Sequence, residues 1–195
     1  MVRLLGTGIR LAAVSLVAII TVSCAAIRPE HCPYANWNAT GELHASKGFQ
    51  SRLPSLIDTC LQVGVLPDAE AYLAGYQRGL LGFCTIENGW VWGKSRDVNP
   101  NICPPALSSG FDRGFEARST LEQLESEEAN LKSERDELEF RISEGDNINY
   151  ETIRRLRAVN RELDQLDTER RRTRIGFAAW LKAHGLEAPE ELFSY

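Results

Sequence analysis

Apolar residues recur every three, four or seven positions through the second half of the chain, with charged residues between them. The first series comprises Leu121, Leu124, Leu131, Leu138 and Ile142. The second comprises Leu156, Val159, Leu163 and Leu166, and Phe177 continues its register 11 positions later. Residues with this spacing lie on one side of a helix, and the polar segment 143–149 between the two series is typical of a turn. The pattern therefore predicts helices over 116–142 and 150–175 that fold back as an antiparallel coiled-coil hairpin.

The first half, residues 24–115, has shorter apolar runs interrupted by glycine and proline. Pro67 and Asp68 predict the start of a helix, because proline suits the first helical turn and aspartate caps it. Three glycines of that helix share one face: Gly75, Gly79 and Gly82. Each costs an exposed helix about 1 kcal/mol relative to alanine, so we expect this face to pack closely on another backbone. Similar spacing occurs in membrane-helix dimers, but the polar residues inside the motif favour an intramolecular contact.

The dipeptide Asn88-Gly89 lies between β-prone residues. Asparagine followed by glycine supplies the two positive φ angles of a type I′ turn, so this segment predicts a short β-hairpin. Trp90 and Trp92 would then share one face of the second strand. Such a pair either covers a small core or forms a platform for a sugar ring.

The N-terminus has the features of an export signal. Arg3 and Arg10 precede the apolar run Leu11–Ile20. This run matches the core of a secretory signal peptide and is short for a segment that spans a bilayer. We therefore predict a signal peptide over residues 1–23 and export of the remaining chain.

The residues that follow resemble the lipobox of bacterial lipoproteins, because the small residue Ser23 directly precedes Cys24. The resemblance implies that Cys24 carries acyl chains, palmitate among them, and becomes the mature N-terminus. Ala25 in place of aspartate implies sorting to the outer membrane, as in enteric bacteria. Ordinary secretion with cleavage near Ala25 or Ala26, and an uncleaved anchor, stay open as alternatives.

Four further cysteines are Cys32, Cys60, Cys84 and Cys103. An even number in an exported chain is typical of disulfides, and four cysteines allow three pairings. Pairing in sequence order is favoured because it joins two adjacent segments. It gives Cys32–Cys60 and Cys84–Cys103, each contributing about 3–4 kcal/mol. Metal binding and a catalytic thiol are disfavoured, since no Cys-x-x-Cys pair exists and only His31 adjoins a cysteine.

Several motifs in the first half occur in a familiar order. They are Trp37-x-x-x-Gly41, Cys60-x-x-x-Gly64-x-x-Pro67-Asp68, Tyr72-x-x-Gly75-x-x-x-Gly79-Leu80, Cys84 before Asn88-Gly89, and Cys103-Pro104. This order resembles a family of small bacterial lipoproteins known as domain of unknown function 2799, over about residues 24–118. After Gly93 the chain departs from the family pattern. The resemblance implies no activity, ligand or catalytic residue.

Charge separates the two predicted helices of the hairpin. The chain has 195 residues, 25% of them charged, and a net charge of −5. Residues 116–142 carry nine acidic and four basic side chains, whereas 150–175 carry five acidic and eight basic ones. These opposite net charges favour an antiparallel pair, and the acidic balance argues against nucleic acid as a partner. The basic residues Arg170–Arg172 and Arg174 are expected to neutralise the first helix, with phosphate head groups as the alternative.

Together these features predict a mainly α protein. A small disulfide-stapled helical module with a short β-hairpin (24–115) precedes the antiparallel coiled-coil hairpin (116–175), and a C-terminal tail (176–195) docks back on the module. We expect a non-enzymatic, membrane-anchored envelope lipoprotein, facing the periplasm from the outer membrane, that acts as a structural or protein-interaction module. Its expected partners are the membrane, an envelope protein and a second copy of the chain. We predict no cofactor, metal or catalytic residue.

Two other functions are consistent with the pattern. A cell-wall glycan-binding or glycan-processing module would use Trp90 and Trp92 for the sugar and Glu87 or Asp97 as acid and base. Alternatively, the helical hairpin is a solvated spacer without a partner.

Overall fold

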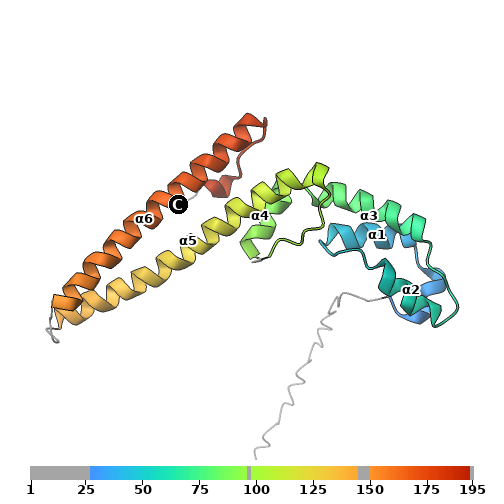
Figure 1. The fold of residues 1–195 in the computed structure, drawn as a ribbon, viewed down its shortest axis with the longest axis horizontal. Helices are drawn as coiled ribbons and strands as arrows, with labels where there is room; N and C mark the ends of the chain where they lie inside the picture. The colour runs from blue at the N-terminus through green and yellow to red at the C-terminus, as the bar shows by residue number, and fades with distance from the viewer. Residues whose placement is uncertain (1–26, 96–97, 145–149, 194–195) are drawn as a thin grey trace, which may run out of the picture.

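The structure is a computed structural model that describes residues 27–95, 98–144 and 150–193. It is mainly helical, and no strand occurs among the residues described. The elements are η1 (Pro29–Tyr34), α1 (Trp37–Ser46), α2 (Leu53–Leu61), α3 (Ala69–Phe83), α4 (Ile86–Ser95), α5 (Pro105–Ser143), α6 (Tyr150–Ala183) and η2 (Glu190–Leu192). Helices α1 to α3 form one end of the molecule, and α5 with α6 forms a long arm toward the other (Figure 1).

The β-hairpin predicted around Asn88-Gly89 is wrong, because these residues lie in α4. The Thr85 hydroxyl caps this helix by accepting a hydrogen bond from the Asn88 backbone N–H at 3.2 Å. Gly89 allows close packing rather than a turn, since a Cβ there would lie 2.1 Å from the carbonyl oxygen of Phe111 in α5. Contact with α5 therefore overrides the local turn preference.

Helices α1 and α3 form a parallel pair in which glycines bring the backbones together. A Cβ on Gly75 would lie 1.8 Å from the Asn38 carbonyl oxygen, and one on Gly79 would lie 2.4 Å from that of Glu42. The residue numbers rise together along both helices, so they run in the same direction. The predicted close packing is confirmed for these two glycines. It is wrong for Gly82, where an added Cβ would meet nothing within 4 Å.

Helices α4 and α5 form a second parallel pair of the same kind. A Cβ on Gly89 would lie 2.1 Å from the Phe111 carbonyl oxygen, and one on Gly93 would lie 2.6 Å from that of Phe115. Such contacts need glycine because any side chain would collide with the partner backbone. The Cys-rich segment, as described over residues 27–115, thus contains two successive helix pairs. Each pair needs glycine where its two backbones meet.

The two pairs share local sequence as well as geometry. Tyr72-x-x-Gly75 in α3 corresponds to Phe111-x-x-Gly114 in α5, and both aromatic side chains are fully buried. In each pair the aromatic residue lies one turn before the glycine that contacts the partner backbone. The aromatic residue and the glycine of α3 therefore make the same kinds of contact as their counterparts in α5, which indicates an internal structural repeat.

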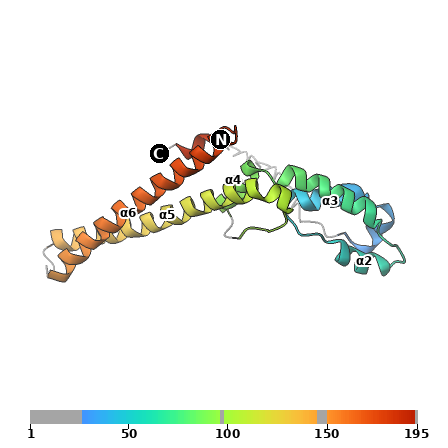
Figure 2. The same ribbon diagram turned by 45° about the horizontal axis from the view of Figure 1, so that its top comes forward.

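The arm begins inside the Cys-rich segment rather than after it. Helix α5 continues for 39 residues, past the expected boundary at residue 115, and at 1.5 Å per residue it is about 58 Å long. Helix α6, with 34 residues, lies antiparallel along the outer part of α5 (Figures 1 and 2). One continuous helix therefore connects the helix pairs to the arm.

The C-terminal segment packs on the second helix pair. Phe177 and Leu181 of α6 and Leu192 of η2 join a buried cluster with Trp90 of α4 and Leu121 of α5. Each of these five side chains is at most 4% exposed. This cluster fixes the base of the arm against α4.

Candidate functional site

The four cysteines predicted to form disulfides do so in sequence order. Cys32–Cys60 and Cys84–Cys103 each have a Cα–Cα distance of 5.6 Å. Cys84–Cys103 lies directly before the N-terminal ends of α4 and α5, whereas Cys32–Cys60 joins η1 to the C-terminal end of α2. Because all four sulfurs are bonded to each other, none of them is a free thiol nucleophile or metal ligand. Their role is to join segments of the chain that are 28 and 19 positions apart in sequence.

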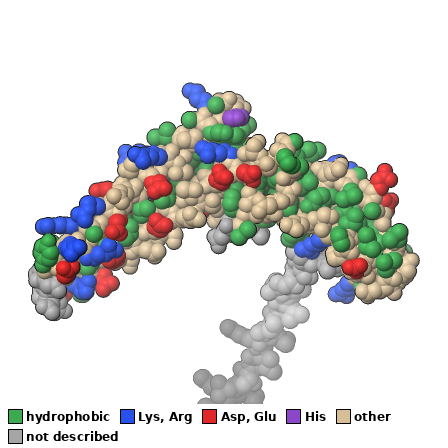
Figure 3. All heavy atoms as spheres, in the orientation of Figure 1, with side chains coloured by type: hydrophobic (Ala, Val, Ile, Leu, Met, Phe, Trp, Pro, Cys, Tyr) green, Lys and Arg blue, Asp and Glu red, His purple; other side chains and the backbone are tan. Residues whose placement is uncertain are grey.

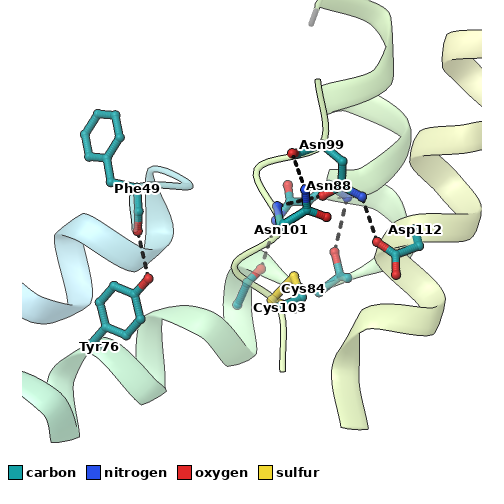
Figure 4. Close-up of a disulfide and its surroundings, with 10 residues drawn as sticks. Phe49, Tyr76, Cys84, Asn88, Asn99, Asn101, Cys103 and Asp112 are labelled. Carbon is teal, nitrogen blue, oxygen red and sulfur yellow. Dashed lines mark hydrogen bonds between the residues drawn. A yellow bond between two sulfur atoms is a disulfide. The ribbon is translucent and has the colours of Figure 1, made fainter. Parts of the chain in front are cut away.

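A network of side-chain amides surrounds the second disulfide (Figure 4). Asn99 donates to the Asp112 carboxylate at 2.8 Å and accepts from the Asn101 backbone N–H at 2.9 Å. Asn101 has a φ of 51°, a left-handed conformation that asparagine tolerates better than most residues. These contacts fasten the loop before Cys103 to α5. The sequence shows the asparagines but not their partners.

Trp90 and Trp92 do not share an exposed face. Trp90 is 4% exposed and stacks on Phe177 at a ring-centroid distance of 5.0 Å, and Arg118 lies 5.3 Å from its ring. Trp92 packs edge-on against Phe83, with centroids 5.2 Å apart. A turn of about 200° separates positions i and i+2 of a helix, which sends the rings to different sides. Their main contacts are with other parts of the core. The shared strand face predicted for the two rings is therefore wrong, and glycan binding stays an untested prediction.

A cavity of about 700 Å³ lies between α4 and the C-terminal segment. Its walls include Glu87, Trp90, Val91 and Lys94 from α4, opposite residues 187–191. Lys94 forms an ion pair with Glu191 at 3.7 Å, which links the two walls. The cavity therefore combines an apolar floor with a mainly acidic rim. Asp97, the second predicted carboxylate, lies outside the described residues.

His44 and Tyr72 form a polar contact that no sequence spacing indicates, because the α1–α3 crossing creates it. The buried Tyr72 hydroxyl accepts a hydrogen bond from the Arg52 backbone N–H at 3.0 Å and lies 2.9 Å from His44 Nδ1. It can therefore donate its own proton to the neutral imidazole. Burial lowers the pKa of His44, and the nearby positive charge of Arg52 lowers that pKa further.

This contact predicts a pH-dependent component of stability. Because the pKa of His44 is lowered on folding, the unfolded chain binds the proton more tightly than the folded one. Stability is thus fully present above the usual histidine pKa of about 6.5 and falls as the pH drops below it. In His44→Gln we expect a smaller loss of unfolding free energy between pH 7.5 and 5.5, measured by urea denaturation. His184→Gln, at an exposed ring stacked on Trp180, is the control and should keep the wild-type slope.

Ion pairs connect the two helices of the arm. Arg155 of α6 contacts Glu134 of α5 at 2.6 Å, and Arg170 contacts Glu128 at 2.6 Å. Hydrogen bonds from Arg155 lower the pKa of Glu134. The expected neutralisation of α5 by α6 is therefore observed at these positions.

The arginine cluster is only partly used in this way. Arg170 bridges to α5, whereas Arg171 pairs with Asp167 of its own helix. Hydrogen bonds from Arg171 and then Arg170 lower the pKa of Asp167. Arg172 lines a shallow cavity of about 230 Å³ between α5 and α6. At least two arginines of the cluster, Arg170 and Arg171, therefore form ion pairs within the arm.

Cys24, the predicted lipidation site, lies outside the described residues. None of the helices in the described part of the chain combines the length and apolarity needed to cross a bilayer. Within the same residues, no group of three or more His, Cys, Asp and Glu side chains is placed to hold a metal ion.

The family model for proteins of unknown function DUF2799 matches residues 36–119. The resemblance to this family that the motifs indicated is thereby confirmed over residues 36–119. The DUF2799 segment runs from the N-cap of α1 to the part of α5 that packs on α4, so it contains both parallel helix pairs. The arm beyond residue 119 lies outside the match. No curated protein and no solved structure matches the chain.

The motifs that indicated DUF2799 have structural roles in this chain. Asp68 caps α3, as predicted, by accepting a hydrogen bond from the Ala71 backbone N–H at 2.9 Å. Gly41 allows close approach of α1 to α3, since a Cβ there would lie 2.0 Å from the Tyr72 carbonyl oxygen. The DUF2799 motifs thus describe how two helix pairs pack and are capped.

Proposed function

We propose that this protein is a non-enzymatic envelope lipoprotein that presents a helical arm to a protein partner. A signal peptide over residues 1–23 directs export, and acyl chains on Cys24 hold the protein in the outer membrane, facing the periplasm. The DUF2799 segment, together with η1 and its disulfide to α2, serves as a rigid base. The antiparallel coiled-coil hairpin projects from it.

The observation that carries this proposal is the free end of the arm. Phe140 of α5 and Tyr150 of α6 are 63% and 75% exposed, and both lie at the end of the arm where α5 ends and α6 begins. Aromatic side chains are enriched at the energetic centres of protein interfaces. Two exposed aromatic residues at the end of a helical arm provide an anchor point for another protein.

The base of the arm supports the same function. The C-terminal segment and α4 bury Phe177 and Leu181, which ties the start of the arm to the DUF2799 segment. The ion pairs between α5 and α6 hold the two helices together farther out. A rigidly held arm loses less conformational entropy on binding than a flexible one.

Photo-crosslinking in cells tests this proposal. A photoreactive residue replacing Phe140 or Tyr150 should give one discrete adduct with an envelope protein or with a second copy of the chain. The control places the photoreactive residue at Ile175, which is 63% exposed in α6 near the base of the arm. This variant should not form the adduct. With the probe at Phe140, Tyr150→Ser should weaken the adduct. Equal, diffuse adducts at all three positions would instead favour a solvated spacer.

A further inference from the structure

We propose that the end of the described fold opposite the arm rests on the membrane surface. This membrane-facing end consists of η1, α2 and the turn 62–68. The inference rests on the lipid anchor of the proposed function and adds the orientation of the protein on the bilayer. It follows from the length of the chain before η1 and from the side chains exposed at this end.

The chain between the anchor and the structured module is very short. Four peptide steps separate Cys24 from Arg28, and they span at most about 14 Å when fully extended. The head-group layer of one leaflet is itself about 5–8 Å thick. An acyl anchor on Cys24 therefore holds η1, which begins at Pro29, at or just above the head groups.

Apolar side chains are exposed at this same end. Tyr34 at the end of η1 is 89% exposed, Leu61 at the end of α2 is 54% exposed, and Val63 and Leu66 in the turn are 47% and 71% exposed. Tyrosine and aliphatic side chains are suited to the membrane interface, tyrosine because its ring is apolar and its hydroxyl polar. In Figure 3 apolar side chains are spread over the half of the molecule that contains α1 to α3, with charged side chains among them.

These residues are held in one rigid unit. The Cys32–Cys60 disulfide joins η1 to α2. The backbone N–H groups of Val63 and Val65 each donate to the Cys60 carbonyl oxygen at 3.1 Å, which fixes the turn against α2. The membrane-facing end therefore needs no refolding to contact lipid, and the protein loses little conformational entropy when it makes the contact.

Charge at this end favours an apolar contact over an electrostatic one. Arg28 is paired with Glu30 at 3.9 Å, and acidic residues such as Asp58 and Asp68 balance the positive charge of Arg52. There is no basic cluster here of the kind that attracts anionic lipids. We therefore expect contact with zwitterionic lipid and little sensitivity to salt.

The contact would also orient the arm. Helices α1 and α3 both begin at the membrane-facing end and run away from it, and the arm continues from the opposite end of the DUF2799 segment (Figure 1). Resting this end on the bilayer thus directs the exposed aromatic residues of the arm away from the membrane that holds the anchor.

Quenching by brominated lipid tests this orientation. The full-length protein, produced with its leader and purified in acylated form, carries Leu66→Trp and is placed in zwitterionic phosphatidylcholine vesicles brominated at shallow acyl positions. The fluorescence contributed by position 66 should fall relative to unbrominated vesicles. Leu81→Trp, on an exposed residue of α3 nearer its C-terminal end, is the matched control and should be unaffected. Circular dichroism checks that both variants are folded.

Mass spectrometry of the purified protein separates the two proposals. Acyl chains on Cys24 with quenching at position 66 support both. Acyl chains without quenching overturn the membrane-facing end, for instance because a protein covers it, and leave the anchor intact. Unmodified Cys24 overturns the anchor, and with it the tether on which this inference depends.

Discussion

Gly75→Ala destabilises the protein although alanine is the better helix former. The new Cβ would lie 1.8 Å from the Asn38 carbonyl oxygen, which is backbone and cannot rotate away. Helices α1 and α3 must separate, and overpacking of this kind costs about 1–3 kcal/mol or more. The free energy of unfolding, measured by urea denaturation with circular dichroism, should fall by that amount.

Gly82→Ala is the matched control, since it makes the same change in the same helix. A Cβ at Gly82 would meet nothing within 4 Å. The substitution should therefore stabilise the protein by up to about 1 kcal/mol through helix propensity alone. If both variants were stabilised equally, α1 and α3 would not be packed through their glycines.

Removal of either disulfide has the second large effect. Cys32→Ala with Cys60→Ala, or Cys84→Ala with Cys103→Ala, releases a loop with a sequence separation of 28 or 19 residues. Loop-closure entropy predicts a loss of about 3–4 kcal/mol for each, and the two losses should be similar because the dependence on loop length is logarithmic. Urea denaturation under non-reducing conditions measures both.

A reducing agent supplies the control for this prediction. It should lower the stability of the wild type toward that of a variant lacking all four cysteines, and leave that variant unchanged. Four titratable thiols in the exported, unreduced protein would contradict the disulfide assignment. Peptide mapping without reduction identifies the pairing directly.

Helix positions in the arm were predictable because the signal is local. The apolar series through Leu121 and Leu163 has the period of a helix, and opposite charges on the two segments favour an antiparallel arrangement. The cap at Asp68 was likewise predictable, since a capping side chain acts on the backbone within three residues. Such features depend on near neighbours in sequence.

The errors have one physical origin. Asn88-Gly89 has the composition of a tight turn, yet Gly89 is glycine because Phe111 lies against it, 22 positions away. Trp90 and Trp92 would share a face in a strand but not in the helix that α5 imposes. Gly82 follows the spacing of its neighbours, yet α1 does not reach it. Local pattern alone cannot tell a glycine needed for conformation from one needed for contact.

The sequence by itself determined the helical arm, the even set of cysteines and the family motifs, because each depends on residues close along the chain. For the same reason it predicts an export signal and a lipobox, and these stay predictions. Only the tertiary structure decided that the Cys-rich segment is two parallel helix pairs and that His44 meets Tyr72. It also decided that Tyr34, Leu61 and Leu66 are exposed at the end of the fold formed by η1, α2 and the turn 62–68. These depend on helix crossings, and a crossing is fixed by which backbones can approach each other once the whole chain has packed.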